Sequence, residues 1–281
     1  MLVITTNTEL NTFLKTIKKD NNLGLVPTMG ALHSGHLSLV KKAIKENDHV
    51  IVSIFVNPTQ FNNKEDLEKY PQTLDTDIKL LSMASDQIVV YVPSVSEVYK
   101  KEVTPKKYNF QGLDLVMEGE FRDDHFNGVG TIVEMLLNLI KPNNAYFGEK
   151  DFQQLQIIKK LTEIENIPVN IIGCPIVRES HGLAMSSRNE RLPSQIRQEA
   201  SIIYNTLKAA KEKFGTKSAK VITDWVTKVI NDNPNFKIEY IEISDAQTLK
   251  PIKRKQKGKK YRAFIAVYTA NVRLIDNIAL N

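Results

Sequence analysis

The chain has 281 residues with 38 Lys+Arg against 32 Asp+Glu, a formal net charge of +6, and so mild an excess permits a small anionic ligand without requiring nucleic acid. Charged residues at 25% and hydrophobic residues at 42% are typical of a globular protein. A single cysteine, Cys174, excludes an intramolecular disulfide and a cysteine-based zinc site.

The first part of the sequence alternates strands and helices. Apolar periodicity and β-branched runs predict, in chain order, a helix over 9–19, a strand over 23–27, a helix over 36–46, a strand over 50–56, a helix over 73–83 and a strand over 87–91. This alternation predicts an α/β fold, a Rossmann-like, doubly wound parallel sheet with helices on both faces.

The middle and the end of the sequence follow different patterns. The middle predicts one or two short strands over 106–116, a helix over 128–140, a strand over 145–147, a helix over 151–165 and a strand over 169–174. Helices over 193–213 and 218–231 then precede alternating strands over 237–244, 261–269 and 272–279. Helices followed by strands indicate an α+β unit, so we predict a Rossmann-like domain over 1–176 and a smaller α+β domain with an antiparallel sheet over 177–281.

No apolar window is long enough to span a membrane, and the N-terminus lacks the pattern of a signal peptide. We therefore expect a cytoplasmic protein with no membrane partner.

The segment LVPTMGALHSGHLSLV connects the first predicted buried strand to its helix, a favoured ligand position in a doubly wound sheet. Gly30 and Gly35 have Walker A spacing, but His36 and Leu37 stand where Lys and Ser or Thr are needed, which excludes an NTPase P-loop. What remains is a backbone open to phosphate and two imidazoles, His33 and His36, on one side of a helix start. They can donate hydrogen bonds to charge that develops on a phosphate. Alternatively, one histidine only caps the helix; a zinc site would lack an evident third ligand.

Polar residues gather at three further places. In YFGEKDFQQLQ, Lys150 can neutralise phosphate and Asp151 can cap a helix or hold a ribose or metal. LAMSSRNERL combines two hydroxyls with Arg188, which suits nucleotide phosphates but is also typical of an ordinary turn. Asn57 and Gln60 follow the predicted VIVSIFV strand, where neutral amides can bind a substrate hydroxyl or carboxylate.

The segment PIKRKQKGKKYR carries six basic residues among the eight from 253 to 260. It could form a polyanion-binding patch. We favour a solvated hairpin loop whose lysines discourage edge aggregation, and so predict no nucleic-acid partner.

PTMGALHSGH resembles the HIGH-type loop of adenylate-forming nucleotidyltransferases, and MSSRN resembles their KMSKS-like loop. Together with SIFVNPTQF, YPQTLDTD, FGEKDFQQL and RLIDN, the chain from about residue 23 onward resembles the pantoate–β-alanine ligase (pantothenate synthetase) family. The resemblance implies ATP-dependent condensation of (R)-pantoate with β-alanine through a pantoyl adenylate, with AMP and pyrophosphate released, Mg²⁺ as cofactor and a homodimeric state. Another HIGH-type nucleotidyltransferase is the alternative, although such enzymes do not call for the FGEKDFQQL block.

The resemblance also implies residue roles. His36 would be the catalytic imidazole and proton donor, and the other expected catalytic residues are His33, Lys150 and Arg188. The expected ATP-binding residues are Met29, Gly30, Ala31, Leu32, His33, Ser34, Gly35, His36, Gly148, Glu149, Lys150, Asp151, Val177, Met185, Ser186, Ser187 and Arg188. Those from 185 to 188 would close onto the phosphates from the second domain.

For the acid and amine substrates, the resemblance places pantoate and β-alanine at Gln60 and pantoate at Gln154, and Asn57 joins the substrate-binding set. Asp77 would be the Mg²⁺ ligand. Three places depart from the family pattern: His181 stands where Asp is expected, Asp123–Asp124 replace a Pro-Gly pair, and Ala270 stands where a hairpin Gly is usual.

Overall fold

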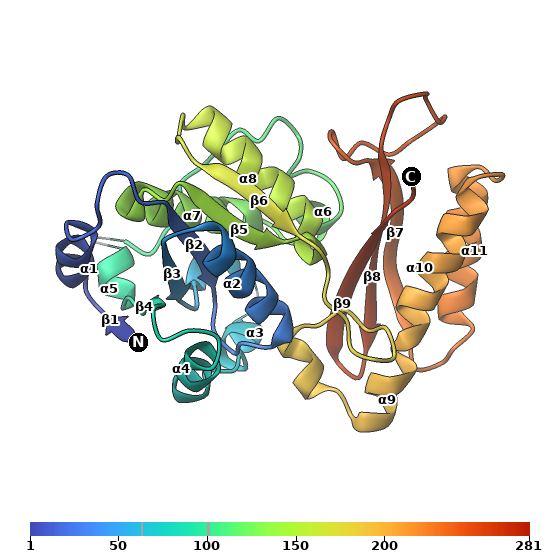
Figure 1. The fold of residues 1–281 in the computed structure, drawn as a ribbon. Coiled ribbons are helices and arrows are strands. Elements are labelled where there is room, and N and C mark those ends of the chain that lie inside the picture. Colours follow the sequence, from blue (N-terminus) through green and yellow to red (C-terminus); the bar gives the residue numbers. More distant parts are fainter. Residues whose placement is uncertain (63, 100–101) are drawn as a thin grey trace. The chain divides into compact units, whose positions relative to one another are not determined.

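The computed structural model describes residues 1–62, 64–99 and 102–281, and the chain divides into two compact units (Figure 1). The first unit comprises Met1–Asp114, Glu118–Glu149 and Gln154–Pro175. The second comprises Leu115–Met117, Lys150–Gln153 and Ile176–Asn281.

The first unit is built on a six-stranded sheet in the order β1-β4-β3-β2-β5-β6, and every neighbouring pair is parallel. Its strands are β1 (Leu2–Ile4), β2 (Leu23–Thr28), β3 (His49–Ile54), β4 (Val89–Tyr91), β5 (Asn144–Gly148) and β6 (Asn170–Cys174). The predicted Rossmann-like sheet is confirmed. The sequence missed β1, because three residues at a sheet edge are too short to show a periodicity.

Helices cover both faces of this sheet. The helices along this part of the chain are α1 (Asn7–Leu14), α2 (Ser34–Glu46), α3 (Lys64–Glu68), α4 (Leu74–Ser82), α5 (Val95–Val98), α6 (Glu118–Phe121), α7 (His125–Ile140) and α8 (Phe152–Ile164), with the 3-10 helices η1 (Pro58–Gln60) and η2 (Glu149–Asp151). Val40 of α2 and Leu81 of α4 pack in one buried cluster with Val52 of the sheet. Leu155 of α8 packs on the opposite face, where a β-carbon on Gly173 would lie 2.9 Å from its Cδ2 atom.

The strand order reverses between β2 and β5. From β2 the chain moves to β3 on one side, whereas β5 pairs with β2 on the other side. In an open parallel sheet, ligands bind at the carboxyl ends of the strands at such a reversal. The loop that follows β2 therefore starts at a favoured binding position.

The strands predicted over 106–116 are wrong. Two backbone N–H groups there bond to α7 side chains rather than to a strand: Lys106 donates to Thr131 Oγ1 at 2.8 Å and Tyr108 donates to Asn127 Oδ1 at 3.0 Å. Gln111 then takes a φ of +56°, which ends any extended conformation.

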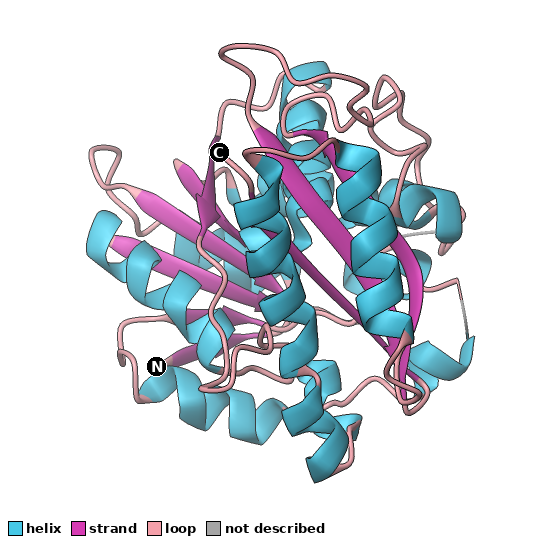
Figure 2. Cartoon of the chain, turned by 90° about the vertical axis from the view of Figure 1, so that its right-hand side faces the viewer, coloured by secondary structure: helices cyan, strands magenta, loops and turns pink. Residues whose placement is uncertain are grey.

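The second unit packs helices on a three-stranded antiparallel sheet, as Figure 2 shows. Its elements are η3 (Ser187–Arg191), α9 (Ser194–Glu199), α10 (Ser201–Phe214), α11 (Ala219–Asn231), β7 (Lys237–Asp245), β8 (Tyr261–Thr269) and β9 (Val272–Ala279). The helix predicted over 193–213 is two helices, separated at Ala200. Leu207 of α10 and Val226 of α11 pack in one cluster with Ile265 of β8.

The β8–β9 turn carries one of the family departures. Ala270 and Asn271 have φ of +45° and +61°, the two left-handed residues of a tight hairpin turn. An alanine therefore occupies a conformation that glycine adopts more easily. Within the described parts of the chain, no helix is long and apolar enough to cross a membrane.

Candidate functional site

The two histidines of the loop between β2 and α2 accept backbone N–H groups at the start of α2. His33 is the N-cap of α2, and its Nδ1 atom accepts the Gly35 N–H at 3.1 Å. His36 accepts the His33 N–H through its own Nδ1 at 3.3 Å, so the two imidazoles form a reciprocal capping box. A ring nitrogen that accepts carries no proton, so both imidazoles are neutral and hold their proton on Nε2.

The two imidazole rings can cap the helix and bind a ligand at the same time, two roles that the sequence presents as alternatives. Their centroids lie 4.1 Å apart, and both side chains are partly exposed. Capping and ligand binding use different ring atoms, because Nδ1 serves the helix and Nε2–H is a donor. The same histidines can therefore cap the helix and donate to an anion.

Asp77 fills the turn that precedes these histidines. Its side chain is buried, and its Oδ2 and Oδ1 atoms accept the N–H groups of Ala31 and Leu32 at 2.9 and 2.8 Å. Gly30 and Ala31 have φ of +80° and +49°, which turns the successive amides toward one carboxylate, as in an anion-binding nest. The amides of Ala31 and Leu32 thus bind an anionic side chain, and phosphate binding by the backbone of this loop stays a prediction.

The same contacts bear on the Mg²⁺ role expected for Asp77. The carboxylate accepts two amides and the Thr73 hydroxyl, the last at 3.2 Å. Among the residues described, no group of three His, Cys, Asp or Glu side chains could hold a metal ion. These residues do not fit a metal centre held by the protein, whereas Mg²⁺ commonly arrives on the phosphates of its nucleotide.

Asn57 and Gln60 lie in and beside η1, after β3. Asn57 is buried, and its Nδ2 donates to Gly128 O at 3.0 Å and to Gln60 Oε1 at 3.2 Å. Its Oδ1 accepts the hydroxyls of Tyr99 at 2.5 Å and Thr59 at 3.0 Å. Both donors and both lone pairs are used, so the Asn57 side chain holds Gln60 in this structure. Its contact with a substrate stays a prediction.

Gln60 itself lies next to the loop that follows β2. Its Nε2 atom is 2.8 Å from Met29 Sδ, a weak acceptor, and the side chain is not buried. The structure thus brings together two predicted site residues that are 31 positions apart in the sequence.

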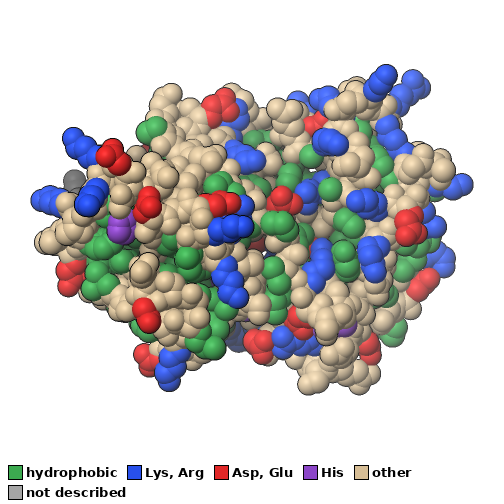
Figure 3. All heavy atoms as spheres, in the orientation of Figure 1, with side chains coloured by type: hydrophobic (Ala, Val, Ile, Leu, Met, Phe, Trp, Pro, Cys, Tyr) green, Lys and Arg blue, Asp and Glu red, His purple; other side chains and the backbone are tan. Residues whose placement is uncertain are grey.

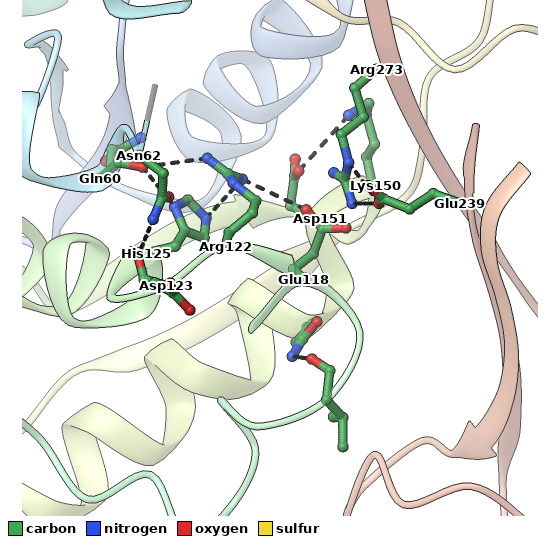
Figure 4. A network of polar contacts seen from close by, with 12 residues as sticks. Gln60, Asn62, Glu118, Arg122, Asp123, His125, Lys150, Asp151, Glu239 and Arg273 are labelled. Atoms are coloured by element: carbon green, nitrogen blue, oxygen red, sulfur yellow. Dashed lines mark hydrogen bonds and ion pairs between the residues drawn. The ribbon is translucent and has the colours of Figure 1, made fainter. Parts of the chain in front are cut away.

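Lys150 follows β5 in η2. Its side chain is only 19% exposed, and Nζ lies 3.8 Å from Asp151 Oδ1 (Figure 4). The Lys150 carbonyl accepts Asn277 Nδ2 at 2.8 Å, so the RLIDN segment fixes the backbone at this lysine. The two glutamines that follow differ: Gln153 is buried and donates to Val116 O at 2.7 Å, whereas Gln154 is partly exposed.

The MSSRN segment sits on a short hairpin of the second unit. Val177 O accepts the Met185 N–H at 3.0 Å, which places these two predicted site residues side by side. Ser186 caps η3 and accepts the Arg188 N–H at 3.3 Å, while Ser187 and Arg188 are partly exposed.

A polar cluster that the sequence did not indicate braces this segment. Glu179 accepts Asn189 Nδ2 at 2.7 Å and Arg197 Nε at 2.9 Å. Burial alone would raise the pKa of Glu179, but the hydrogen bonds from Arg197 and Asn189 outweigh it and hold the pKa below its ordinary value. His181, the departure beside this segment, lies with Nε2 2.8 Å from Arg197 O.

A second ion pair joins the same hairpin to β9. Arg178 donates to both carboxylate oxygens of Asp276 at 2.6 and 2.9 Å, and its guanidinium stacks on Tyr204 at 3.6 Å. A bidentate pair fixes orientation as well as distance. The acidic residue of the RLIDN segment is therefore a structural partner of Arg178.

The basic residues 253–260 lie in the exposed loop between β7 and β8. Lys and Arg side chains gather there at the upper right of Figure 3. Lys255 lies 4.1 Å from the centroid of the Phe214 ring, and Lys259 pairs with Asp245 at 3.2 Å. Part of the charge is thus used within the unit.

Known proteins match the whole chain. The pantoate-beta-alanine ligase family model matches residues 2–279. The pantothenate synthetase of Flavobacterium psychrophilum is 53% identical over 281 residues and covers 100% of both chains. The crystal structure of the Thermus thermophilus pantothenate synthetase superposes with a TM-score of 0.91 at 37% identity, covering 100% of this chain and 99% of that one. A Francisella tularensis pantoate-beta-alanine ligase, solved with beta-gamma ATP and beta-alanine, gives a TM-score of 0.83 at 37% identity, covering 100% and 98%.

Proposed function

The chain belongs to the pantoate–β-alanine ligase family, and we propose that it makes its amide bond through a pantoyl adenylate. It is a ligase that joins pantoate to β-alanine, with ATP as co-substrate. A pantoate carboxylate oxygen attacks the α-phosphorus of ATP, and the bond to the β-phosphate oxygen breaks, releasing pyrophosphate. The neutral amine of β-alanine then attacks the acyl carbon, AMP leaves, and the amine loses a proton.

The observation that carries this proposal is the neutral imidazole pair. Because Nδ1 of each ring accepts a backbone N–H, His33 and His36 present Nε2–H donors without adding positive charge. Such fixed donors stabilise negative charge that builds on phosphate oxygens during displacement. We assign the principal catalytic role to His36, with His33 beside it.

The remaining substrate contacts follow the matching positions of the family. Lys150 and Arg188 supply positive charge to the phosphates, and Gln60 and Gln154 bind pantoate, with Gln60 also serving β-alanine. The other nucleotide contacts belong to segments 29–36, 148–151 and 185–188 and to Val177. We treat Mg²⁺ as part of the nucleotide substrate and retain the homodimer and the cytoplasmic location as predictions.

Pyrophosphate exchange tests the adenylate. Purified protein should exchange labelled pyrophosphate into ATP only when pantoate is present, because the exchange reverses adenylate formation. AMP should form in a one-to-one ratio with pantothenate. Formation of ADP in place of AMP would contradict the mechanism. Exchange without pantoate would show that a group other than pantoate accepts the AMP moiety of ATP.

A further inference from the structure

Arg122 and His125 lie beside Gln60 and contact its main chain (Figure 4). Nothing in the catalytic assignment above uses either residue. His125 is buried at the start of α7, and Arg122 lies three residues earlier, in the link between α6 and α7. Both stand beside the acidic pair Asp123–Asp124 that departs from the family pattern.

The hydrogen bonds fix the direction of this chain of contacts. Arg122 Nη1 lies 3.1 Å from His125 Nε2, and a guanidinium can only donate. His125 therefore accepts on Nε2 and carries its proton on Nδ1, which lies 2.8 Å from Gln60 O. Arg122 Nη2 donates to the same carbonyl at 3.3 Å, so two donors hold the Gln60 main chain.

The guanidinium is itself oriented from the other side. Glu118 lies one turn before Arg122, with its Oε2 atom 3.6 Å from Nη1. An ion pair on one side and an imidazole on the other limit the rotamers that this long side chain can adopt. The contacts run from Glu118 through Arg122 and His125 to Gln60.

The side chain of Gln60 is held separately from its main chain. Asn57 Nδ2 donates to Gln60 Oε1 at 3.2 Å, which fixes the amide orientation and directs Nε2 away from Asn57. The segment itself is a 3-10 helix of three residues, too short to hold its position alone. It packs on α7 so closely that a β-carbon on Gly128 would lie 2.2 Å from Thr59 O.

We propose that Arg122 and His125 are positioning residues for the ligase reaction, which hold the Gln60 main chain so that its amide meets the pantoate carboxylate or hydroxyl. The proposal rests on the pantoate-binding role proposed for Gln60. A glutamine on a short turn would otherwise lose freedom only when the substrate binds, and that loss of entropy would weaken binding. Neither positioning residue needs to touch pantoate.

The test replaces the donor and then restores it. His125→Phe keeps a ring but removes the Nδ1–H donor, whereas His125→Asn places an amide N–H near the Nδ1 position. We expect the first variant to lower kcat/KM for pantoate about 10–100-fold, the scale of a small misplacement, with KM for ATP changed less than about twofold. The second should recover to within about threefold of the parent enzyme. His49→Phe, the same change at the start of β3, is the matched control and should leave both values unchanged.

A double variant separates positioning from a direct contact. If His125 acts through Gln60, adding His125→Phe to Gln60→Ala should cost less than about twofold beyond Gln60→Ala alone, because residues that act as one unit are not additive. Losses that multiply in the double variant would overturn the proposal. Unchanged pantoate kinetics in Gln60→Ala would overturn the role of Gln60 and, with it, this inference.

A variant of the partly exposed Arg122 tests the same contacts if replacement of the buried His125 prevents folding. Arg122→Met removes both donors while keeping much of the side-chain length, and its circular dichroism and melting temperature report the fold. We expect the same selective loss toward pantoate as in His125→Phe. Equal losses toward ATP and pantoate in folded Arg122→Met would contradict a positioning role at Gln60.

Discussion

Asp77 Oδ2 lies 2.9 Å from the backbone nitrogen of Ala31, so an acidic side chain of α4 occupies the turn that the sequence offers to a phosphate. The carboxylate holds Ala31 in a left-handed conformation, which a non-glycine residue adopts only when its surroundings stabilise it. The two imidazoles that we propose for catalysis, those of His33 and His36, follow this turn directly. Their position relative to the sheet therefore depends on a buried residue more than forty positions away.

Replacing Asp77 by Asn tests this role. The amide keeps one acceptor but turns an N–H₂ group toward backbone donors, so we expect the unliganded protein to lose about 2 kcal/mol of unfolding free energy, the scale of a charged hydrogen bond. Urea unfolding without nucleotide measures the loss. The control is Asp75→Asn, an exposed residue of the same helix, which should change stability by less than about 0.5 kcal/mol.

A metal-ligand role for Asp77 predicts a different pattern. In that case the unliganded Asp77→Asn protein would keep the stability of the parent. Only the Mg²⁺ concentration required for activity would rise.

Two substitutions separate the capping and donor roles of His36. Asn can keep an acceptor near the Nδ1 position but has no group at Nε2. The unfolding free energy of His36→Asn should therefore stay within about 0.5 kcal/mol of the parent value. His36→Ala removes the cap as well and should lose about 1 kcal/mol of unfolding free energy. Both should lower pantoate-dependent pyrophosphate exchange about 10²–10³-fold, the cost of one preorganised donor. If His36→Asn lowered the exchange rate tenfold or less, the Nε2 atom would not be a catalytic donor. His49→Asn is the control.

Arg188→Ala addresses the positive charge assigned to the MSSRN segment. We expect KM for ATP to rise about tenfold or more, since a charged hydrogen bond to phosphate contributes roughly 1.5–3 kcal/mol, while KM for β-alanine stays nearly constant. Initial-rate kinetics with each substrate varied in turn measure the two values. Arg254→Ala, in the exposed basic loop, should leave both unchanged, and unaltered ATP kinetics in Arg188→Ala would remove this residue from the nucleotide site.

The lowered pKa of Glu179 predicts how stability depends on pH. The unfolded carboxyl titrates near pH ~4.3 and binds more protons than the folded one between the two pKa values, so stability rises with pH in that window. The contribution of Glu179 is fully present above the unfolded pKa and is lost as the pH falls through the lowered folded pKa. The measurement is urea unfolding of the parent and Glu179→Gln from about pH 7 downward through the unfolded pKa of about 4.3.

The difference in unfolding free energy between these two proteins should shrink across that acidic range. Glu212→Gln, at an exposed position of α10, should show no such narrowing. A gap independent of pH would mean that the Glu179 carboxylate does not use its charge in the brace around Asn189 and Arg197.

The sequence by itself determined the order of most strands and helices. The pattern of apolar residues identified β2, β3, β5, β8 and β9, because a strand buried in a sheet must be apolar wherever its side chains meet the core. It also located the histidine loop and the MSSRN segment, since both resemble motifs of one enzyme family and occur in the order of that family. The family followed from these local patterns.

Only the tertiary structure decided how each polar side chain is used. The sequence predicts Asp77 and Asn57 as ligands for a metal and a substrate. Only the structure shows that each is buried and hydrogen-bonds to backbone groups far along the chain. Conversely, Arg122 and His125 gave no signal of contact with Gln60, because that contact spans more than sixty residues. A hydrogen bond depends on distance and direction in space, and local sequence patterns specify neither across separate elements.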